Sequence, residues 1–328
     1  MADSGIPVVL VGLGEIGRAI ARAALARPDL QVVAAVDADR AKAGRSLAEV
    51  IGAPAPDLLV APDLRGALAS AAGGVVLLAT GSRFAELLPD LERVVKAGLS
   101  VVSTCEELAY PFLQHEEEAN ALDRLAESRN VAVLGTGVNP GFVLDRLPAL
   151  LGQVTGPVRH VRAVRVVDAS RRRAALQRKI GAGLTEDAFH DAAERGEVGH
   201  LGLLESAALA AVGLGLAIDE VDDEVAPLVA EEDWDGPIPV RRGQVAGVSQ
   251  VARVFADERE VVRLELTIAI GAEDPRDEVE LDADPPLRLV VPGGISGDAA
   301  TAAAVVNAVP AVTELRGLVT VLDLPAGH

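Results

Sequence analysis

Two adjacent carboxylates follow directly on a short apolar run of this chain. The stretch VSTCEELAYP begins at Val102 and places Glu106 and Glu107 just after a predicted buried strand. A carboxylate at such a strand end can attract an ammonium or iminium group and can exchange a proton during hydride transfer. The alternative is that the acids begin a solvated helix, where carboxylates complement the helix dipole. We expect this helix-start role for one of the two, and a place near the reacting carbon for the other.

A glycine-rich turn near the N-terminus supplies a second chemical signal. The apolar run PVVLV ends in GLGEIG, and the residues after it show helical periodicity. Glycines at this spacing allow a tight turn, close approach of the backbone to a pyrophosphate, and close helix–strand packing. The pattern predicts a dinucleotide site whose turn contributes Gly12, Gly14, Glu15, Ile16 and Gly17.

The predicted cofactor is NAD or NADP. The next apolar run, LQVVAAVD, ends in Asp37, at the distance where a carboxylate accepts hydrogen bonds from the ribose hydroxyls. Asp37 favours NAD, but the nearby cations Arg40, Lys42 and Arg45 can reach a 2′-phosphate, so the preference stays open. Ligands of such sheets bind at the carboxyl ends of strands. Further cofactor contacts are therefore predicted at Thr80, Gly81, Ser82 and Thr104.

The order of apolar runs predicts an α/β protein with two kinds of sheet. Through residue 138, buried strands alternate with helical stretches, which indicates a Rossmann-type doubly wound parallel sheet. Period-two alternation in 158–170 and 237–281 then indicates an α+β second domain with a largely antiparallel open sheet. We expect domains at 1–138 and 139–298, and a C-terminal helix and strand, 299–328, that return toward the nucleotide domain. A large open sheet commonly needs to be covered, and two copies of the chain can cover each other's sheets, so we predict a homodimer.

Composition and charge exclude several classes of protein. The 328 residues carry a formal net charge of −19, which argues against binding nucleic acid or an anionic membrane surface. No apolar run reaches the length of a membrane span, and the N-terminus lacks the pattern of a secretory signal. A single cysteine cannot form an internal disulfide, which fits the cytoplasm. The five histidines and Cys105 show no metal-ligand spacing, so no metal is predicted.

Other polar residues are candidates for a substrate pocket. Asn139, Pro140 and Phe142 follow a strand and either line the substrate side of the cofactor or form a turn. The basic run that includes Arg172 can bind a substrate carboxylate, although most of its members suit salt bridges better. A lone histidine is more often structural than catalytic. The predicted pocket residues are Asn139, Pro140, Phe142, Asp168, Arg172 and His200.

Six segments together give the chain a resemblance to a known family. They are GLGEIGRAIAR, VSTCEELAYP, GTGVNPGFVLDRLP, VDASRRRAALQRKIGAG, GEVGHLGLLES and GGISGDAATAAAVVNAVP. The chain resembles the 2,4-diaminopentanoate dehydrogenases and related native amine dehydrogenases, in the dihydrodipicolinate reductase-like superfamily. The resemblance departs at Ser296, where a histidine is often expected.

The resemblance implies NAD(P)-dependent oxidative deamination of an aliphatic amine or diamino acid to a ketone and ammonia, or the reverse reductive amination. It also implies one catalytic glutamate in the CEE segment, and both Glu106 and Glu107 remain candidates. Two alternatives stay open. One is a dehydrogenase of an alcohol or semialdehyde, similar to homoserine dehydrogenase, and the other is a cofactor-binding regulator without turnover.

Overall fold

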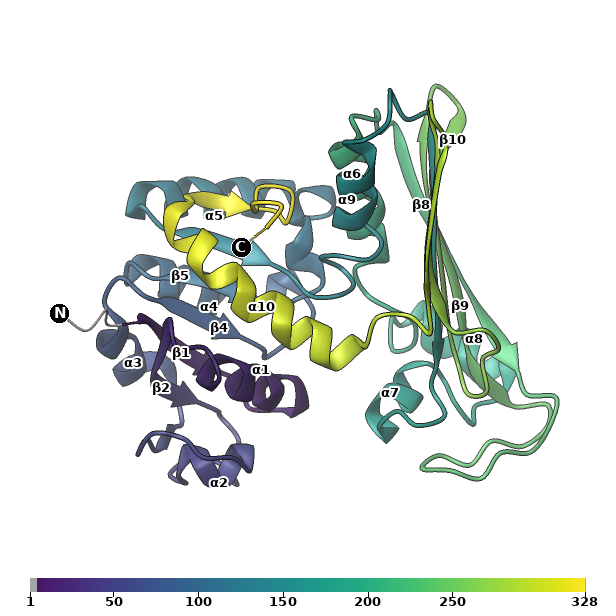
Figure 1. The fold of residues 1–328 in the computed structure, drawn as a ribbon. Coiled ribbons are helices and arrows are strands. Elements are labelled where there is room, and N and C mark those ends of the chain that lie inside the picture. Colours follow the sequence, from purple (N-terminus) through teal and green to yellow (C-terminus); the bar gives the residue numbers. More distant parts are fainter. Residues whose placement is uncertain (1–4, 328) are drawn as a thin grey trace. The chain divides into compact units, whose positions relative to one another are not determined.

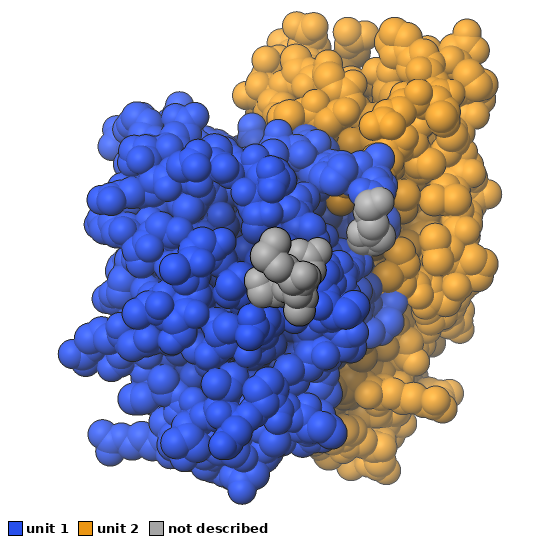
Figure 2. Space-filling view, turned by 60° about the vertical axis from the view of Figure 1, so that its left-hand side comes forward, with its two compact units in different colours: residues 1–142, 296–328 blue, residues 143–295 orange. Residues whose placement is uncertain are grey.

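The computed structural model describes residues 5–327, so the first four residues of the N-terminal segment considered above, 1–4, lie outside it. Two compact units make up the chain: residues 1–142 with 296–328, and residues 143–295 (Figure 2). No helix within the described residues is both long enough and apolar enough to cross a membrane.

The first unit is built on a parallel sheet. Within its described residues the sheet has seven strands in the order β13-β6-β5-β4-β1-β2-β3, and every pairing is parallel. The direction of winding reverses between β1 and β4, which confirms the predicted doubly wound sheet and marks the place where ligands of such sheets bind. The strands are β1 (Ile6–Val11), β2 (Leu30–Val36), β3 (Val60–Ala61), β4 (Val75–Leu78), β5 (Ser100–Ser103), β6 (Ala132–Gly135) and β13 (Gly317–Val319).

Helices cover both faces of this parallel sheet (Figure 1). On one face, α1 packs against α10, and α10 contacts the central strands β4, β5 and β6. On the other, side chains of α3, α4 and α5 form one apolar cluster with Val9, Val76 and Val101. The helices are α1 (Glu15–Leu25), α2 (Leu47–Ile51), α3 (Leu64–Ala67), α4 (Phe84–Lys96), α5 (Glu116–Arg129) and α10 (Gly297–Glu314), with 3-10 turns at Leu68–Ala71, Glu107–Ala109 and Pro111–Leu113.

The second unit is built on a mixed sheet. Its six described strands follow the order β12-β11-β7-β10-β9-β8, and among them only β7 and β10 pair in parallel. This confirms the largely antiparallel sheet that the period-two alternation predicts. The strands are β7 (His160–Asp168), β8 (Glu220–Val229), β9 (Val245–Ala256), β10 (Arg259–Ala269), β11 (Arg276–Asp282) and β12 (Leu287–Pro292).

One face of the mixed sheet packs against α9, which contacts β8, β9 and β10. Alternate residues on the sheet, such as Ala252, Val254 and Leu264, are fully buried on this side. Alternation along a strand therefore points the residues between them, such as Arg253 and Arg263, to the opposite face. The helices of this unit are α6 (Arg146–Gly152), α7 (Ala174–Lys179), α8 (Glu186–Glu194) and α9 (Leu203–Leu214).

Candidate active site

The glycine turn joins β1 to α1 with a geometry that two of its positions can reach only as glycine. Gly12 has φ +83°, and a Cβ there would lie 2.5 Å from the Ala79 carbonyl oxygen. A Cβ on Gly17 would lie 1.8 Å from the carbonyl oxygen of Gly12. Gly14, at the N-cap of α1, faces open space, since a Cβ there would meet nothing within 4 Å. A backbone this open at a helix start can approach a phosphate and donate N–H groups to it.

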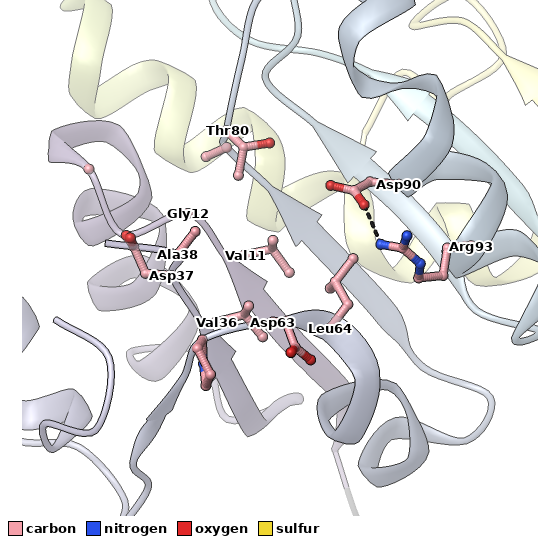
Figure 3. Close-up of a pocket in the computed structure, with 13 residues that line it drawn as sticks. Val11, Gly12, Val36, Asp37, Ala38, Asp63, Leu64, Thr80, Asp90 and Arg93 are labelled. Atoms are coloured by element: carbon pink, nitrogen blue, oxygen red, sulfur yellow. Dashed lines mark hydrogen bonds and ion pairs between the residues drawn. The ribbon is translucent and has the colours of Figure 1, made fainter. Parts of the chain in front are cut away.

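A cavity of about 510 Å³ lies beside this turn (Figure 3). Its walls come from the carboxyl ends of β1, β2 and β4, where the direction of winding reverses, and from the start of α3. This volume is in the range of pockets that bind small molecules and cofactors. The lining residues are Val11, Gly12, Gly14, Val36, Asp37, Ala38, Pro62, Asp63, Leu64, Ala79, Thr80, Asp90 and Arg93.

Asp37 is the buried carboxylate of this cavity. Its Oδ2 accepts hydrogen bonds from the Leu13 N–H at 2.8 Å and from the Lys42 ammonium at 2.9 Å, and its Oδ1 accepts the Asp39 N–H at 2.8 Å. Burial raises the pKa of Asp37, but the hydrogen bonds from Lys42, Asp39 and Leu13 outweigh it and leave the pKa lowered. A carboxylate offers about four acceptor sites, so three donors leave room for a ribose hydroxyl.

The two adjacent glutamates have different surroundings. Glu107 is buried, and its Oε2 accepts the N–H of Phe84, the first residue of α4, at 2.7 Å. Its carboxylate also lies 3.6 Å from Arg83 Nη1 and 3.7 Å from His115 Nε2. Glu106 is half-buried, with Oε2 enclosed. The acid that complements a helix start is therefore Glu107, and the helix is α4 rather than one that begins at the glutamates.

Neighbouring strands hold the segment that carries the glutamates. The Glu107 N–H donates to the carbonyl oxygen of Ser82, beyond the end of β4, at 3.2 Å. On the other side, a Cβ on Gly135 of β6 would lie 2.5 Å from the Leu108 backbone carbon, so only glycine allows this approach. The structure thus brings the predicted cofactor contact Ser82 and the glutamates together at the carboxyl edge of one sheet. Thr104, between β5 and Glu106, is half-buried in the same segment.

Cys105 lies in this segment as a buried thiol. Burial, together with the charges of Glu106 and Glu107, raises its pKa to about 12, although backbone N–H groups partly oppose the rise. The nucleophile in thiol chemistry is the thiolate, which this pKa suppresses at neutral pH. Cys105 therefore packs as a small apolar side chain.

The loop that follows β6 holds Asn139, Pro140 and Phe142 in the first unit. The loop is tight: Gly141 has φ +125°, and a Cβ there would lie 2.4 Å from the Gly137 nitrogen. The Val138 N–H donates to Thr301 Oγ1 of α10 at 3.2 Å. Sequence reasoning missed Thr301, although the segment GGISGDAAT that contains it belongs to the family resemblance.

The remaining predicted pocket residues, Asp168, Arg172 and His200, lie in the second unit. Asp168 Oδ1 accepts the Ser170 N–H and hydroxyl at 2.9 and 2.6 Å and the Gly271 N–H at 3.1 Å. Burial raises the pKa of Asp168, but the hydrogen bonds from Ser170 and Gly271 together outweigh it and leave the pKa lowered. The same bonds tie the end of β7 to the end of β10. His200 exchanges backbone hydrogen bonds with the buried amide of Gln250, at 2.9 and 3.2 Å.

Arg172 is half-buried between β7 and α7. Across residues 5–327, no group of three or more His, Cys, Asp or Glu side chains is arranged to hold a metal ion. Sequence reasoning also missed two walls of the cavity, residues 62–64 and the Asp90–Arg93 ion pair of α4. Residues 62–64 follow β3, which has only two residues and is too short to show a strand pattern.

A parallel sheet with a glycine turn at its switch point, an open helix start and a buried carboxylate at the end of the next strand is the arrangement of dinucleotide-binding proteins, and this is the class of the first unit. Residues 142–328 match the family described as 2,4-diaminopentanoate dehydrogenase C-terminal domain, and the chain belongs to this family. The predicted family is thereby confirmed.

Relatives extend the similarity over the whole chain. It is 29% identical to 2,4-diaminopentanoate dehydrogenase of Acetoanaerobium sticklandii, over 98% of this chain and 93% of that protein. Amine dehydrogenase of Streptomyces virginiae is 32% identical over 50% of this chain and 47% of its own length. The structure of amine dehydrogenase from Mycobacterium smegmatis has a TM-score of 0.87 and 21% identity, covering 100% of this chain and 98% of that one. These relatives are oxidoreductases acting on CH–NH2 groups, in agreement with the predicted enzyme class.

More distant structures share the fold and carry the predicted cofactors. GenD2, in complex with NAD, has a TM-score of 0.51 and 19% identity, covering 89% of this chain and 73% of that one. An engineered D-amino acid dehydrogenase, bound to NADP+, has a TM-score of 0.50 and 14% identity, covering 98% of this chain and 95% of that one.

Proposed function

We propose that this protein is an NAD(P)-dependent amine dehydrogenase that converts an aliphatic amine or diamino acid to a ketone and ammonia, or runs the reverse reductive amination. The observation that carries the proposal is the position of the Glu106–Glu107 segment. It lies at the carboxyl edge of the same sheet as the cofactor cavity, with its backbone bonded to Ser82 beyond β4. Carboxylates at that edge suit a substrate nitrogen that carries positive charge.

Different residues of the first unit would contact different parts of the cofactor. The open backbone at Gly14 and the start of α1 would hold the pyrophosphate, and Asp37 would accept from the adenosine ribose. Residues 80–82 would contact the nicotinamide half at the end of β4. When bound, NAD(P) supplies the two-electron acceptor, so that the carbon bearing nitrogen gives up a hydride and the substrate becomes an iminium ion.

The carboxylate chemistry is assigned to Glu106. Glu107 is committed to the N-terminus of α4, whereas Glu106 is half-buried on the same segment. In deamination, Glu106 accepts the proton that the substrate ammonium loses before the C–H bond breaks. Water then adds to the iminium carbon, and the C–N bond breaks to release ammonia and the ketone. In the amination direction, the same carboxylate would hold ammonium beside the ketone and take the proton that frees ammonia to add to the carbonyl carbon. After loss of water and hydride transfer, it would return that proton to the amine product.

Ammonia dependence tests this proposal. The purified protein is mixed with NADH or NADPH and a series of aliphatic ketones and keto acids, with and without ammonium chloride, and cofactor oxidation is followed by absorbance. We expect oxidation that requires both ketone and ammonium. Equal rates without ammonium, or turnover of alcohols alone, would instead identify an alcohol or semialdehyde dehydrogenase. Cofactor binding without any turnover would identify a regulator.

The protein is further proposed to be a cytoplasmic homodimer that pairs through the charged face of its mixed sheet. Cys105 is a free thiol, which supports a location in a reducing compartment such as the cytoplasm. On the sheet face opposite α9, Arg253, Arg263 and Arg162 lie side by side on β9, β10 and β7, with acids around them. Arg253 and Arg162 are only 19% and 34% exposed in a single chain. Their ion pairs join Arg253 to Asp222, Glu224 and Glu260, Arg263 to Glu260 and Glu265, Arg162 to Glu265 and Glu280, and Arg288 to Glu278 and Glu280.

Charges that are already paired cost less to remove from water, and a two-fold axis would set arginines of one copy against acids of the other. Light scattering after gel filtration should give twice the chain mass of 33.8 kDa. Arg263→Glu places a negative charge beside Glu260 and Glu265 on this face. The variant should therefore have the mass of one chain. Arg195→Glu, at an exposed pair of the same unit, is the control that should stay dimeric. A single-chain mass for the unmodified protein would refute the dimer.

A further inference from the structure

Asp37, the buried carboxylate that lines the cavity, forms an ion pair with Lys42. Lys42 Nζ lies 2.9 Å from Asp37 Oδ2 and 3.6 Å from Asp39 Oδ2, and its side chain is 26% exposed. The segment from Asp37 to Lys42 contains two acids and two bases, so its formal charge is zero. The negative charge of Asp37 at this end of the cavity is therefore balanced by Lys42, whereas a lone carboxylate at a strand end would leave it unbalanced.

This compensation changes which adenosine ribose the site can accept. A carboxylate at this position accepts hydrogen bonds from a 2′-hydroxyl and repels a 2′-phosphate, while a nearby cation accommodates the phosphate. Here the cation already touches the carboxylate, and Asp37 also keeps acceptor capacity beyond its three donors. The same pair of side chains can thus meet either a hydroxyl, through Asp37, or a phosphate, through Lys42.

The same turn contains a second cationic side chain, Arg40. Arg40 is exposed, and within residues 5–327 it forms no ion pair, in contrast to Arg45, which pairs with Glu49 at 3.4 Å. The turn is fixed by local bonds: the Lys42 N–H donates to the Asp39 carbonyl oxygen, and the Ala41 N–H donates to Asp39 Oδ1. Lys42 is consequently held on the side of the turn that faces Asp37.

We propose that Lys42 is a specificity-determining residue that makes this site accept NADP as well as NAD, by neutralising Asp37 and donating to the 2′-phosphate. The inference rests on the proposed nicotinamide-dependent function. It assigns to Asp37 the hydroxyl form of the cofactor and to Lys42 the phosphorylated form.

Calorimetric titration without amine or ketone tests this assignment. The ligands are NAD and NADP, together with their adenosine fragments 5′-AMP and adenosine 2′,5′-bisphosphate, which differ by the 2′-phosphate. The proteins are the unmodified chain, Lys42→Ala, Lys42→Arg, and the control Lys96→Ala, which removes a lysine paired with Glu92 at the far end of α4.

We expect the unmodified protein to bind NADP within about tenfold of NAD, because the counter-ion removes most of the repulsion. Lys42→Ala should weaken NADP and adenosine 2′,5′-bisphosphate by about tenfold or more and leave the 2′-hydroxyl ligands within about threefold. Lys42→Arg should restore phosphate binding, and Lys96→Ala should change neither class.

A loss in Lys42→Ala that is no more than about threefold greater for the 2′-phosphate ligands overturns the assignment and leaves Lys42 a structural partner of Asp37. So does an unmodified protein that prefers NAD by more than about a hundredfold. Because no substrate is present, this result is independent of the amine chemistry. The binding pattern without amine turnover would remove only the proposed function, and turnover without the pattern would remove only this inference.

Discussion

Replacing Glu106 by glutamine should lower kcat for ammonia-dependent ketone reduction by about 100- to 10,000-fold, the usual contribution of a positioned acid–base group. Glutamine keeps the size and hydrogen-bonding reach of the side chain but can neither take nor return a proton. The measurement is steady-state NADH or NADPH oxidation at saturating ketone and ammonium, with cofactor affinity determined separately by calorimetry. We expect the cofactor affinity to stay within about threefold, since the contacts proposed for the ribose and phosphate groups are made by other residues.

Glu107→Gln is the matched comparison, because it makes the same chemical change one residue away. Its amide oxygen can still accept the Phe84 N–H, but the carboxylate charge beside Arg83 and His115 is lost. We expect lower stability, by about 1 kcal/mol as for other changes at helix starts, and a kcat within about tenfold of the unmodified enzyme. A kcat loss in Glu107→Gln larger than that in Glu106→Gln would reverse the assignment of roles. Unchanged rates in both variants would remove the carboxylate mechanism.

The difference between these two glutamates shows where sequence reasoning ends. That acids follow β5 was readable from the apolar run before them, and a helix-start role for one of them was expected. Which acid takes that role depends on Phe84, which lies 23 residues earlier in the chain and meets Glu107 only because β4 and β5 are neighbours. Contacts between strand ends follow from sheet order, and no local pattern encodes them.

The glycine turn and Asp37 of the first unit were easier to predict from the sequence, because the patterns that indicate them are local. The strand, the three glycines and the helix follow one another directly, and Asp37 ends the next strand. The lysine that pairs with Asp37 is only five residues away, yet its direction is set by the turn at Asp39. In the second unit, period-two alternation predicted the sheet but not the parallel pairing of β7 with β10, which are about a hundred residues apart. The six-residue α7 is too short to show a helical period.

A buried ion pair in the second unit carries the largest stability prediction. Arg165 and Asp277 are 4% and 1% exposed, and Arg165 Nη1 donates to Asp277 Oδ1 at 2.7 Å. Both side chains also bind Ile295: Arg165 Nη2 donates to its carbonyl oxygen at 2.8 Å, and Asp277 Oδ2 accepts its N–H at 2.6 Å. The pair thus fixes β7, β11 and the last residue of this unit. Burial lowers the pKa of Arg165, and the charge and hydrogen bond of Asp277 oppose this, so each group depends on the other.

Arg165→Met should therefore lower the free energy of unfolding by about 3–5 kcal/mol, because it leaves the Asp277 carboxylate buried without its counter-ion. The double variant Arg165→Met with Asp277→Leu should lose much less, since an apolar pair of similar volume removes the buried charge altogether. Urea denaturation followed by circular dichroism measures both, with Arg195→Met at an exposed ion pair as the control whose midpoint should not move. If the double variant is as unstable as the single one, the loss comes from packing and the bonds to Ile295 rather than from the unpaired charge.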